Sequence, residues 1–157
     1  MTPIPSDMLS SLVTSTEEVF ETMVFRKLRS QTPIQGEALR PQSNVVGTVA
    51  FAGSRSGVVA LYATTGTAHA ITGAMLGMDP SEVNGEMPDA IGEVTNMIAG
   101  TFRRLASAET PWAISVPTVT VGSDFYTKYV SDVQRALCPF QLDEGEIFVE
   151  LILTAQH

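Results

Sequence analysis

Hydrophobic residues recur at helical spacing in two long stretches of the chain. The first begins at about Ser6 or Asp7 and weakens near Arg26–Arg29, and Thr16 is the weak position of its apolar face. The second runs from about Pro88 to Leu105, and its apolar face consists of Ile91, Val94, Ile98, Phe102 and Leu105. This spacing predicts two amphipathic helices, each of which must bury one face against another element. Three glutamates face away from the core on the first helix: Glu17, Glu18 and Glu21.

The rest of the pattern has the spacing and the turn residues of strands. Four stretches predict two β-hairpins: Val45–Phe51 with Gly57–Ala63, and Val133–Leu142 with Glu146–Thr154. Pro117 interrupts a further strand, Trp112–Val121, which we therefore expect at a sheet edge or in a bulge. We expect a loop over Gly122–Asp132 and a connection over residues 30–44, which could include a short extended piece. A short helix, Ala68–Leu76, should follow a cap at Thr64–Thr67 and end at Gly77, before a turn at Asp79-Pro80.

Two long helices need a common surface on which to bury their apolar faces, and the hairpins supply one. The predicted fold class is therefore α+β, with two long helices packed on a mostly antiparallel sheet. Each half of the chain places a helix before strands, which is a faint internal duplication. The length of 157 residues suits a single domain over residues 1–157.

Composition narrows the classes of partner. The net charge of −8 disfavours nucleic acid and anionic membranes, since both require clustered Lys and Arg. The single cysteine, Cys138, has no internal disulfide partner, which indicates a reducing compartment and a small buried side chain. The first residues lack the basic and apolar regions of a signal peptide, and no apolar run approaches the ~20 residues of a membrane span. We expect a cytoplasmic protein.

Several common chemistries find no support in the sequence. Phosphate-binding glycine motifs are missing, and neither His69 nor His157 has a second ligand at metal spacing, so we expect no metal site. His69 is better explained as a half-buried helix residue than as a base, and Thr64–Thr67 as an ordinary cap than as an anion site. Four methionines are expected to fill the core: Met75, Met78, Met87 and Met97.

The polar face of the second long helix holds the candidate site. At about 100° per residue, Asp89, Glu93, Asn96 and Gly100 fall within an arc of about 60°. An ordinary solvated face could carry the same residues, and Asp89 would suit the helix dipole. Asn and Gly are poor choices inside a helix, however, and the Cβ atoms of Glu93 and Asn96 should lie about 5–6 Å apart. A carboxamide beside a carboxylate can hold a water molecule in one orientation, and placing water is most of the protein's task in phosphoryl transfer.

Arg103 and Arg104 flank this stripe near the end of the helix. They are candidates for contact with an acidic rim on a partner protein. The alternative is that the two cations simply stabilise the helix C-terminus through its dipole.

The pattern Asp89-x-x-x-Glu93-x-x-Asn96-x-x-x-Gly100 on a long helix resembles the signature of the CheC/CheX chemotaxis phosphatases. The order of elements over residues 8–154 is also similar. The resemblance implies a CheC-like fold and hydrolysis of the aspartyl-phosphate of a CheY-like response regulator. It implies that Asn96 orients the attacking water and that Glu93 pairs with a lysine of the regulator. The regulator would supply the phospho-aspartate and Mg²⁺, so no cofactor is expected on this chain.

The first helix offers Glu18 and Glu21 but has no Asn between residues 6 and 29, which indicates one site per chain, as in the CheX-like branch. Membership of that branch would imply a homodimer. Two other functions remain open. The helix could dock a receiver domain or a flagellar-switch or signalling protein without catalysis, as an adaptor. Alternatively, the protein could be purely structural and assemble through exposed strand edges.

Overall fold

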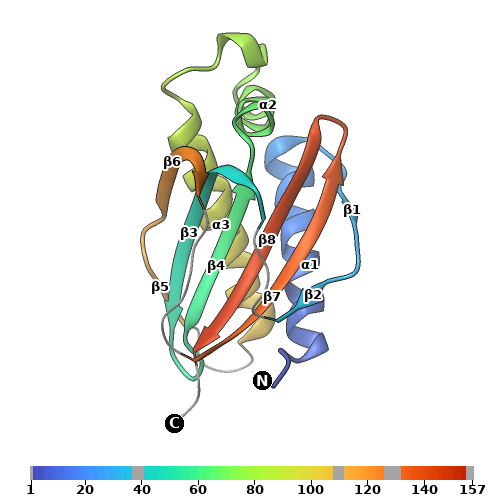
Figure 1. Ribbon diagram of the computed structural model, residues 1–157, viewed down its shortest axis with the longest axis vertical. Helices are drawn as coiled ribbons and strands as arrows, with labels where there is room; N and C mark the ends of the chain where they lie inside the picture. The colour runs from blue at the N-terminus through green and yellow to red at the C-terminus, as the bar shows by residue number, and fades with distance from the viewer. Residues whose placement is uncertain (1, 37–40, 108–111, 126–131, 155–157) are drawn as a thin grey trace.

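The computed structural model describes residues 2–36, 41–107, 112–125 and 132–154, without the side chains of Asp124 and Phe125. Two long helices lie behind one curved sheet, and a shorter helix lies at one end of it (Figure 1). The helices are α1 (Ser6–Val19), continued by the π-helical turn η1 (Phe20–Val24), α2 (Thr65–Leu76) and α3 (Met87–Ala106), with the 3-10 turn η2 (Pro80–Glu82) before α3. The strands are β1 (Arg29–Ser30), β2 (Ile34–Gln35), β3 (Ser43–Ala52), β4 (Gly57–Ala63), β5 (Ala113–Ile114), β6 (Thr118–Phe125), β7 (Val133–Leu142) and β8 (Gly145–Thr154).

The sheet has the order β1-β7-β8-β4-β3-β5, with β2 also on β7 and β6 also on β3. Every strand pair within the described residues is antiparallel. Both predicted hairpins form, β3 with β4 and β7 with β8. The α+β class with two long helices on an antiparallel sheet is thus confirmed.

The first long helix ends at Val24, just before the segment Arg26–Arg29 near which its pattern weakens. Thr16, the weak position of the apolar face, is buried because its hydroxyl donates to the Leu12 carbonyl oxygen at 2.8 Å. The helix widens into η1 and stops at Phe25, whose φ of 61° is left-handed. Arg26 and Arg29 therefore lie beyond the helix. Arg26 Nη1 donates to the carbonyl oxygen of the capping residue, Phe25, at 3.2 Å.

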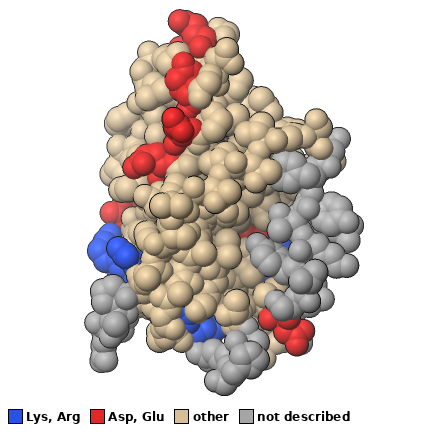
Figure 2. All heavy atoms as spheres, turned by 90° about the vertical axis from the view of Figure 1, so that its left-hand side faces the viewer, with Lys and Arg blue, Asp and Glu red and all other residues tan. Residues whose placement is uncertain are grey.

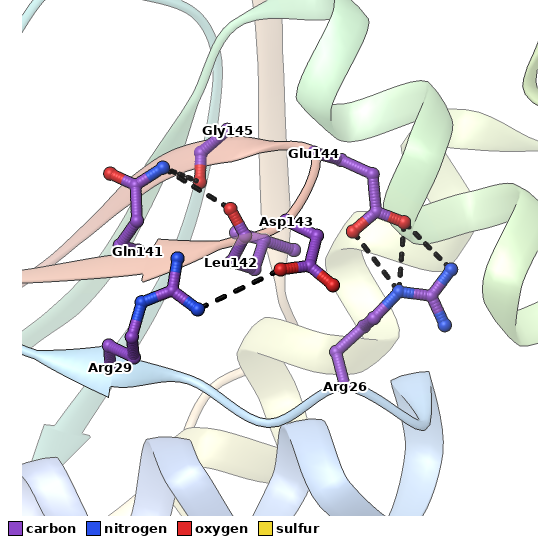
Figure 3. A network of polar contacts seen from close by, with 7 residues as sticks. All are labelled: Arg26, Arg29, Gln141, Leu142, Asp143, Glu144 and Gly145. Carbon is purple, nitrogen blue, oxygen red and sulfur yellow. Dashed lines mark hydrogen bonds and ion pairs between the residues drawn. The ribbon is translucent and has the colours of Figure 1, made fainter.

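These two arginines also hold the tip of the β7–β8 hairpin (Figure 3). The Nε atom of Arg26 donates to both carboxylate oxygens of Glu144, at 2.8 and 3.1 Å, and Arg29 lies 3.7 Å from Asp143. The Gln141 side chain closes the turn by donating to the Gly145 carbonyl oxygen at 3.0 Å. The hydrogen bond from Arg26, with its charge, lowers the pKa of the Glu144 carboxyl group. The segment after α1 is thus fastened to a hairpin more than one hundred residues away in sequence.

The main core lies between the two long helices and the sheet. Helix α3 contributes Ile91, Val94, Ile98 and Phe102, all at most 1% exposed. The prediction fails for Leu105, which is 40% exposed in the last turn of the helix.

Three of the four methionines expected in the core do pack there. Met87 is buried, and Met75 and Met78 pack against the core from its edge. The prediction is wrong for Met97, which is 40% exposed on α3. Cys138 is fully buried, as predicted, and this burial raises the pKa of its thiol to about 12. His69 is half-buried in α2, also as predicted.

The strand predicted over Trp112–Val121 is two strands, because Pro117 separates β5 from β6 and both pair with β3. Strand β6 continues to Phe125, so the loop predicted over Gly122–Asp132 is wrong for its first residues. Gly122, Ser123 and Asp124 lack the apolar side chains typical of a strand, but the pairing of β6 with β3, which reaches Phe125 opposite Ser43, gives this segment backbone partners. The remainder of that predicted loop, residues 126–131, lies outside the described residues.

Hairpin β7–β8 buries side chains on both faces. On the face away from the long helices, Glu150 is fully buried. It accepts hydrogen bonds from the Tyr62 hydroxyl at 2.6 Å and from Arg135 Nε at 2.7 Å. Burial raises the pKa of Glu150, while both partners act in the opposite direction.

No helix within the described ranges has the length and apolarity to cross a membrane.

Candidate functional site

Helix α3 begins with residues suited to a helix start. Pro88 lies in its first turn, where the missing N–H has no helical partner to lose. Asp89 also lies in the first turn, where a carboxylate is stabilised by the helix dipole. Before the helix, Glu86 accepts a hydrogen bond from the Asn84 backbone N–H at 3.0 Å. The helix start is therefore well defined, and with it the rotation of the residues that follow.

Two glycines set the distance between α3 and the sheet. Gly47 of β3 lies against Thr95 so closely that a Cβ at residue 47 would overlap the Thr95 hydroxyl oxygen. Gly92 of α3 lies against β6 and the residue before it, since a Cβ there would stand 3.4 Å from Val119 and 3.7 Å from Pro117. These close contacts fix which face of α3 points toward the sheet and which points away.

The far end of α3 is held by its own arginines. Arg103 donates from Nη1 to the Trp112 carbonyl oxygen at 3.0 Å, and the Trp112 ring stacks on Phe51 with centroids 4.9 Å apart. Arg104 lies 3.7 Å from Glu18 of α1. Both predicted partner-contact arginines thus have partners within this chain. Arg103 ties the helix end to the strand region, and Arg104 links the two long helices.

The predicted stripe points outward. Asp89 and Glu93 are exposed, and Asn96 and Gly100 are half-exposed, all on the side of α3 opposite its buried face. Within the part of the chain that the structure describes, the side chains of Asp89, Glu93 and Asn96 have no hydrogen-bond or ion-pair partner. The carboxylate and the carboxamide are therefore both free to bind a molecule from outside.

The approach to this stripe is acidic. The segment Asp79–Glu93 has five exposed carboxylates, and no Lys or Arg occurs between Arg55 and Arg103. Figure 2 shows acidic side chains in a line on the upper part of one side of the molecule, with basic groups farther down. A positively charged group on a partner would be attracted to this part of the surface.

The described surface also has a groove of about 520 Å³ between α1 and residues 30–33. Its lining includes Leu9, Val13, Thr14 and Pro33 and lacks acidic, basic and histidine side chains. The groove therefore offers no group for acid, base or metal chemistry, and the outer face of α3 remains the candidate site.

The chemistry available on α3 follows from the two exposed head groups. A carboxamide has two N–H donors and one carbonyl acceptor, so Asn96 can orient a water molecule and bind its oxygen and hydrogen atoms at once. An ionised carboxylate only accepts, so Glu93 can pair with a cation or accept a proton. At the i, i+3 spacing the two groups lie close enough to reach one small site on a partner together. The Glu93 carboxylate is repelled by a phosphate group unless a cation supplied from elsewhere lies between the two anions, whereas the Asn96 N–H groups can donate to phosphate oxygens.

Two features of the site were not predicted from sequence. The exposure of Met97 was missed because methionine is typical of cores, although at about 100° per residue it lies only about 40° from Glu93. The contact between Gly47 and Thr95 joins residues far apart in sequence, and nothing in the sequence pattern pairs them.

Comparisons with known proteins agree on one family. The sequence model of the family Chemotaxis phosphatase CheX matches residues 45–141. No curated protein matches the chain.

Solved structures give the same picture. The chemotaxis protein CheX from Desulfovibrio desulfuricans is 27% identical, with a TM-score of 0.83 over 93% of this chain and 98% of that one. CheX from Vibrio vulnificus is 26% identical, with the same TM-score and the same coverage. A chain of the CheX–CheY–BeF₃–Mg²⁺ complex from Borrelia burgdorferi is 20% identical, with a TM-score of 0.77 over 95% of this chain and 99% of that one, which shows a shared fold.

Proposed function

This chain belongs to the CheX family of chemotaxis phosphatases, and from that premise we propose that it accelerates hydrolysis of the aspartyl-phosphate of a CheY-like response regulator. The observation that carries the proposal is the pair Glu93 and Asn96. Both point outward from one helix, one turn apart, without partners among the described residues. An acid and an amide free to enter another protein's reaction centre suit a reaction whose phosphoryl group belongs to that protein.

In the proposed mechanism, α3 docks against the receiver domain and inserts both head groups. Asn96 holds the attacking water in line with the phosphorus–oxygen bond to the aspartate. Glu93 pairs with a lysine beside the phospho-aspartate, which fixes the orientation of the docked helix. The receiver domain contributes the phospho-aspartate and Mg²⁺, and the water attacks phosphorus while the aspartate leaves as a carboxylate. Positioning is a sufficient role, because phosphoryl transfer requires little covalent chemistry from the protein.

A complex of a CheX with a CheY is known from Borrelia burgdorferi. By analogy, the partner of this chain is a CheY-like receiver domain in a chemotaxis pathway of the cytoplasm. The family resemblance further implies that the protein acts as a homodimer, which sedimentation analysis would test. Edge strand β6 is a candidate contact between protomers, since Val121 on it is 52% exposed.

The test is the rate of phosphate release from phosphorylated CheY-like receiver domains, with and without this protein. We expect Asn96→Ala to lower the stimulated rate by about 10²–10³-fold, the size seen when one positioned hydrogen-bond donor is removed from an active site. Asn96→Asp keeps the size of the side chain and removes its N–H donors, so it should be similarly impaired. Glu93→Ala should abolish stimulation through loss of docking and orientation.

Asn84→Ala and Glu146→Ala are matched controls, since both residues are exposed and lie outside α3 and outside its row of carboxylates. They should leave the stimulated rate within about twofold of the wild type. All variants should keep the fold, because the substituted side chains at 93 and 96 have no partners among the described residues. Full activity of both Asn96→Ala and Glu93→Ala would show that the water-positioning mechanism is wrong. Binding without any change in phosphate lifetime would select the adaptor function instead.

A further inference from the structure

Gly100 is a glycine that the fold of this chain does not require. It lies inside α3, and a Cβ added there would meet no atom within 4 Å. Its backbone does not have a positive φ, so the conformation does not require glycine either. Gly92 and Gly47 differ from it, because each packs closely against a neighbouring element. Since glycine is the least favourable helix-interior residue except proline, the choice at position 100 calls for a reason outside this chain.

The position of Gly100 gives that reason. It follows Asn96 by four residues, which is about one turn or about 6 Å along the helix axis. Helical side chains lean toward the N-terminus of their helix and cover the preceding turn. A side chain at position 100 would therefore lie over Asn96 and Met97 and would narrow access to the carboxamide.

The residues around Gly100 leave this space open. Met97 is 40% exposed beside it, an apolar side chain on an otherwise polar face. On the other side, one turn on, Arg104 is drawn toward Glu18 on α1, with 3.7 Å between the charged atoms. The result is a short stretch of bare helix backbone bordered by a flexible thioether side chain. Glycine permits close approach of another backbone, and methionine adapts to the shape of an apolar partner surface.

We propose that Gly100 and Met97 form the approach surface on which the docked receiver domain rests, and that the missing side chain at position 100 sets how closely its reaction centre comes to Asn96. This inference rests on the proposed function and deepens it. Gly100 and Met97 determine how closely the receiver domain docks, whereas Asn96 positions the water molecule. Increasing size at position 100 should then weaken docking in steps, while the helix itself becomes more stable.

The experiment measures binding of a CheY-like receiver domain loaded with beryllofluoride and Mg²⁺, alongside its stimulated dephosphorylation. We expect Gly100→Leu to raise Kd and KM at least tenfold, and Gly100→Ala and Met97→Ala to raise them by less. The denaturant midpoint of both Gly100 variants should equal or exceed that of the wild type. Gly66→Leu is the matched control, because Gly66 is an exposed helical glycine of α2 with open space around it. It should leave Kd and KM within twofold of the wild type.

The outcomes separate the two proposals. If the wild-type protein accelerates dephosphorylation but Gly100→Leu binds and acts as the wild type does, the approach surface is refuted and the proposed function stands. An equal loss of binding in Gly66→Leu would also refute it, because the effect would then not depend on position. If the wild-type protein neither binds any receiver domain nor accelerates hydrolysis, the proposed function fails and this inference fails with it. A graded loss at position 100 alone, without loss of stability, supports the inference.

Discussion

The distance between α3 and the sheet is set at Gly47, and Gly47→Ala tests whether that distance governs activity. A Cβ at residue 47 would overlap the Thr95 hydroxyl oxygen and would stand 3.2 Å from Thr95 Cβ and 3.4 Å from Ile91 Cγ2. Both neighbours belong to α3, and both are fully buried. The substitution therefore presses on the inner face of the helix whose outer face carries Glu93 and Asn96.

The structure allows two ways to relieve the overlap, and each has a cost. Thr95 can rotate, but its hydroxyl then loses the 2.7 Å hydrogen bond to the Ile91 carbonyl oxygen, worth about 1 kcal/mol net. Alternatively, α3 can move outward by on the order of 1 Å, and overpacking of this kind costs about 1–3 kcal/mol. Alanine is better than glycine in a strand by about 0.5–1 kcal/mol, which offsets part of the cost. We expect Gly47→Ala to lower the free energy of unfolding by about 1–2 kcal/mol.

A double-mutant cycle isolates the contact. Thr95→Ala removes the overlapping oxygen, so Gly47→Ala should cost less in a Thr95→Ala background than in the wild type. In urea unfolding, the double variant should be more stable, by about 1 kcal/mol or more, than the sum of the two single-variant effects would predict. Stimulated dephosphorylation should fall in Gly47→Ala, because a misplacement of about 1 Å can cost about 10²-fold in rate, and should recover in the double variant. An additive cycle, or a fully stable and fully active Gly47→Ala, would refute the reasoning.

Two further predictions concern charged pairs away from the site. Glu144→Gln should destabilise the protein at neutral pH by up to about 1 kcal/mol through loss of the pair with Arg26. That pair lowers the folded-state pKa of Glu144. Its contribution to the free energy of unfolding is therefore present above the unfolded-state pKa and is lost as pH falls through the folded-state pKa. The unfolding curves of variant and wild type should converge in acid. Arg135→Met should cost about 3–5 kcal/mol at neutral pH, because it leaves Glu150 buried without its cation. Arg135→Met with Glu150→Leu should recover much of that loss in denaturant unfolding, and failure to recover would contradict a charge-based cause.

Strong periodicity explains why the elements around the site were predictable. Helix α3 was expected over Pro88–Leu105 and spans Met87–Ala106, because a regular apolar face and a clear helix start both mark it. Strand β6 was predicted only to Val121 because an edge strand on β3 is stabilised by backbone pairing and needs no alternation of apolar side chains. Pairing of this kind depends on a partner distant in sequence.

In the candidate site too, the features set by local helix geometry could be predicted from the sequence, and those set by tertiary packing could not. Helical geometry alone placed Asp89, Glu93, Asn96 and Gly100 on one face, and the structure has all four on the outer side of α3. Residue type misled the assignment of Met97, for which the helical angle was the better guide. Periodicity identifies the face of a helix, but it cannot say whether a packing partner extends to the helix end, where Leu105 is exposed.

The two long helices, which the faint duplication relates, differ in the chemistry that their outer faces can support. On α1 and η1, Glu18 and Glu21 are exposed at the same i, i+3 spacing as Glu93 and Asn96 on α3. Two ionised carboxylates only accept hydrogen bonds, so this pair cannot donate to a water oxygen as a carboxamide can. Glu18 is also engaged by Arg104 from α3, at 3.7 Å. The first helix thus supplies an anchor for the second, and under the proposed mechanism this asymmetry gives one water-positioning site per chain.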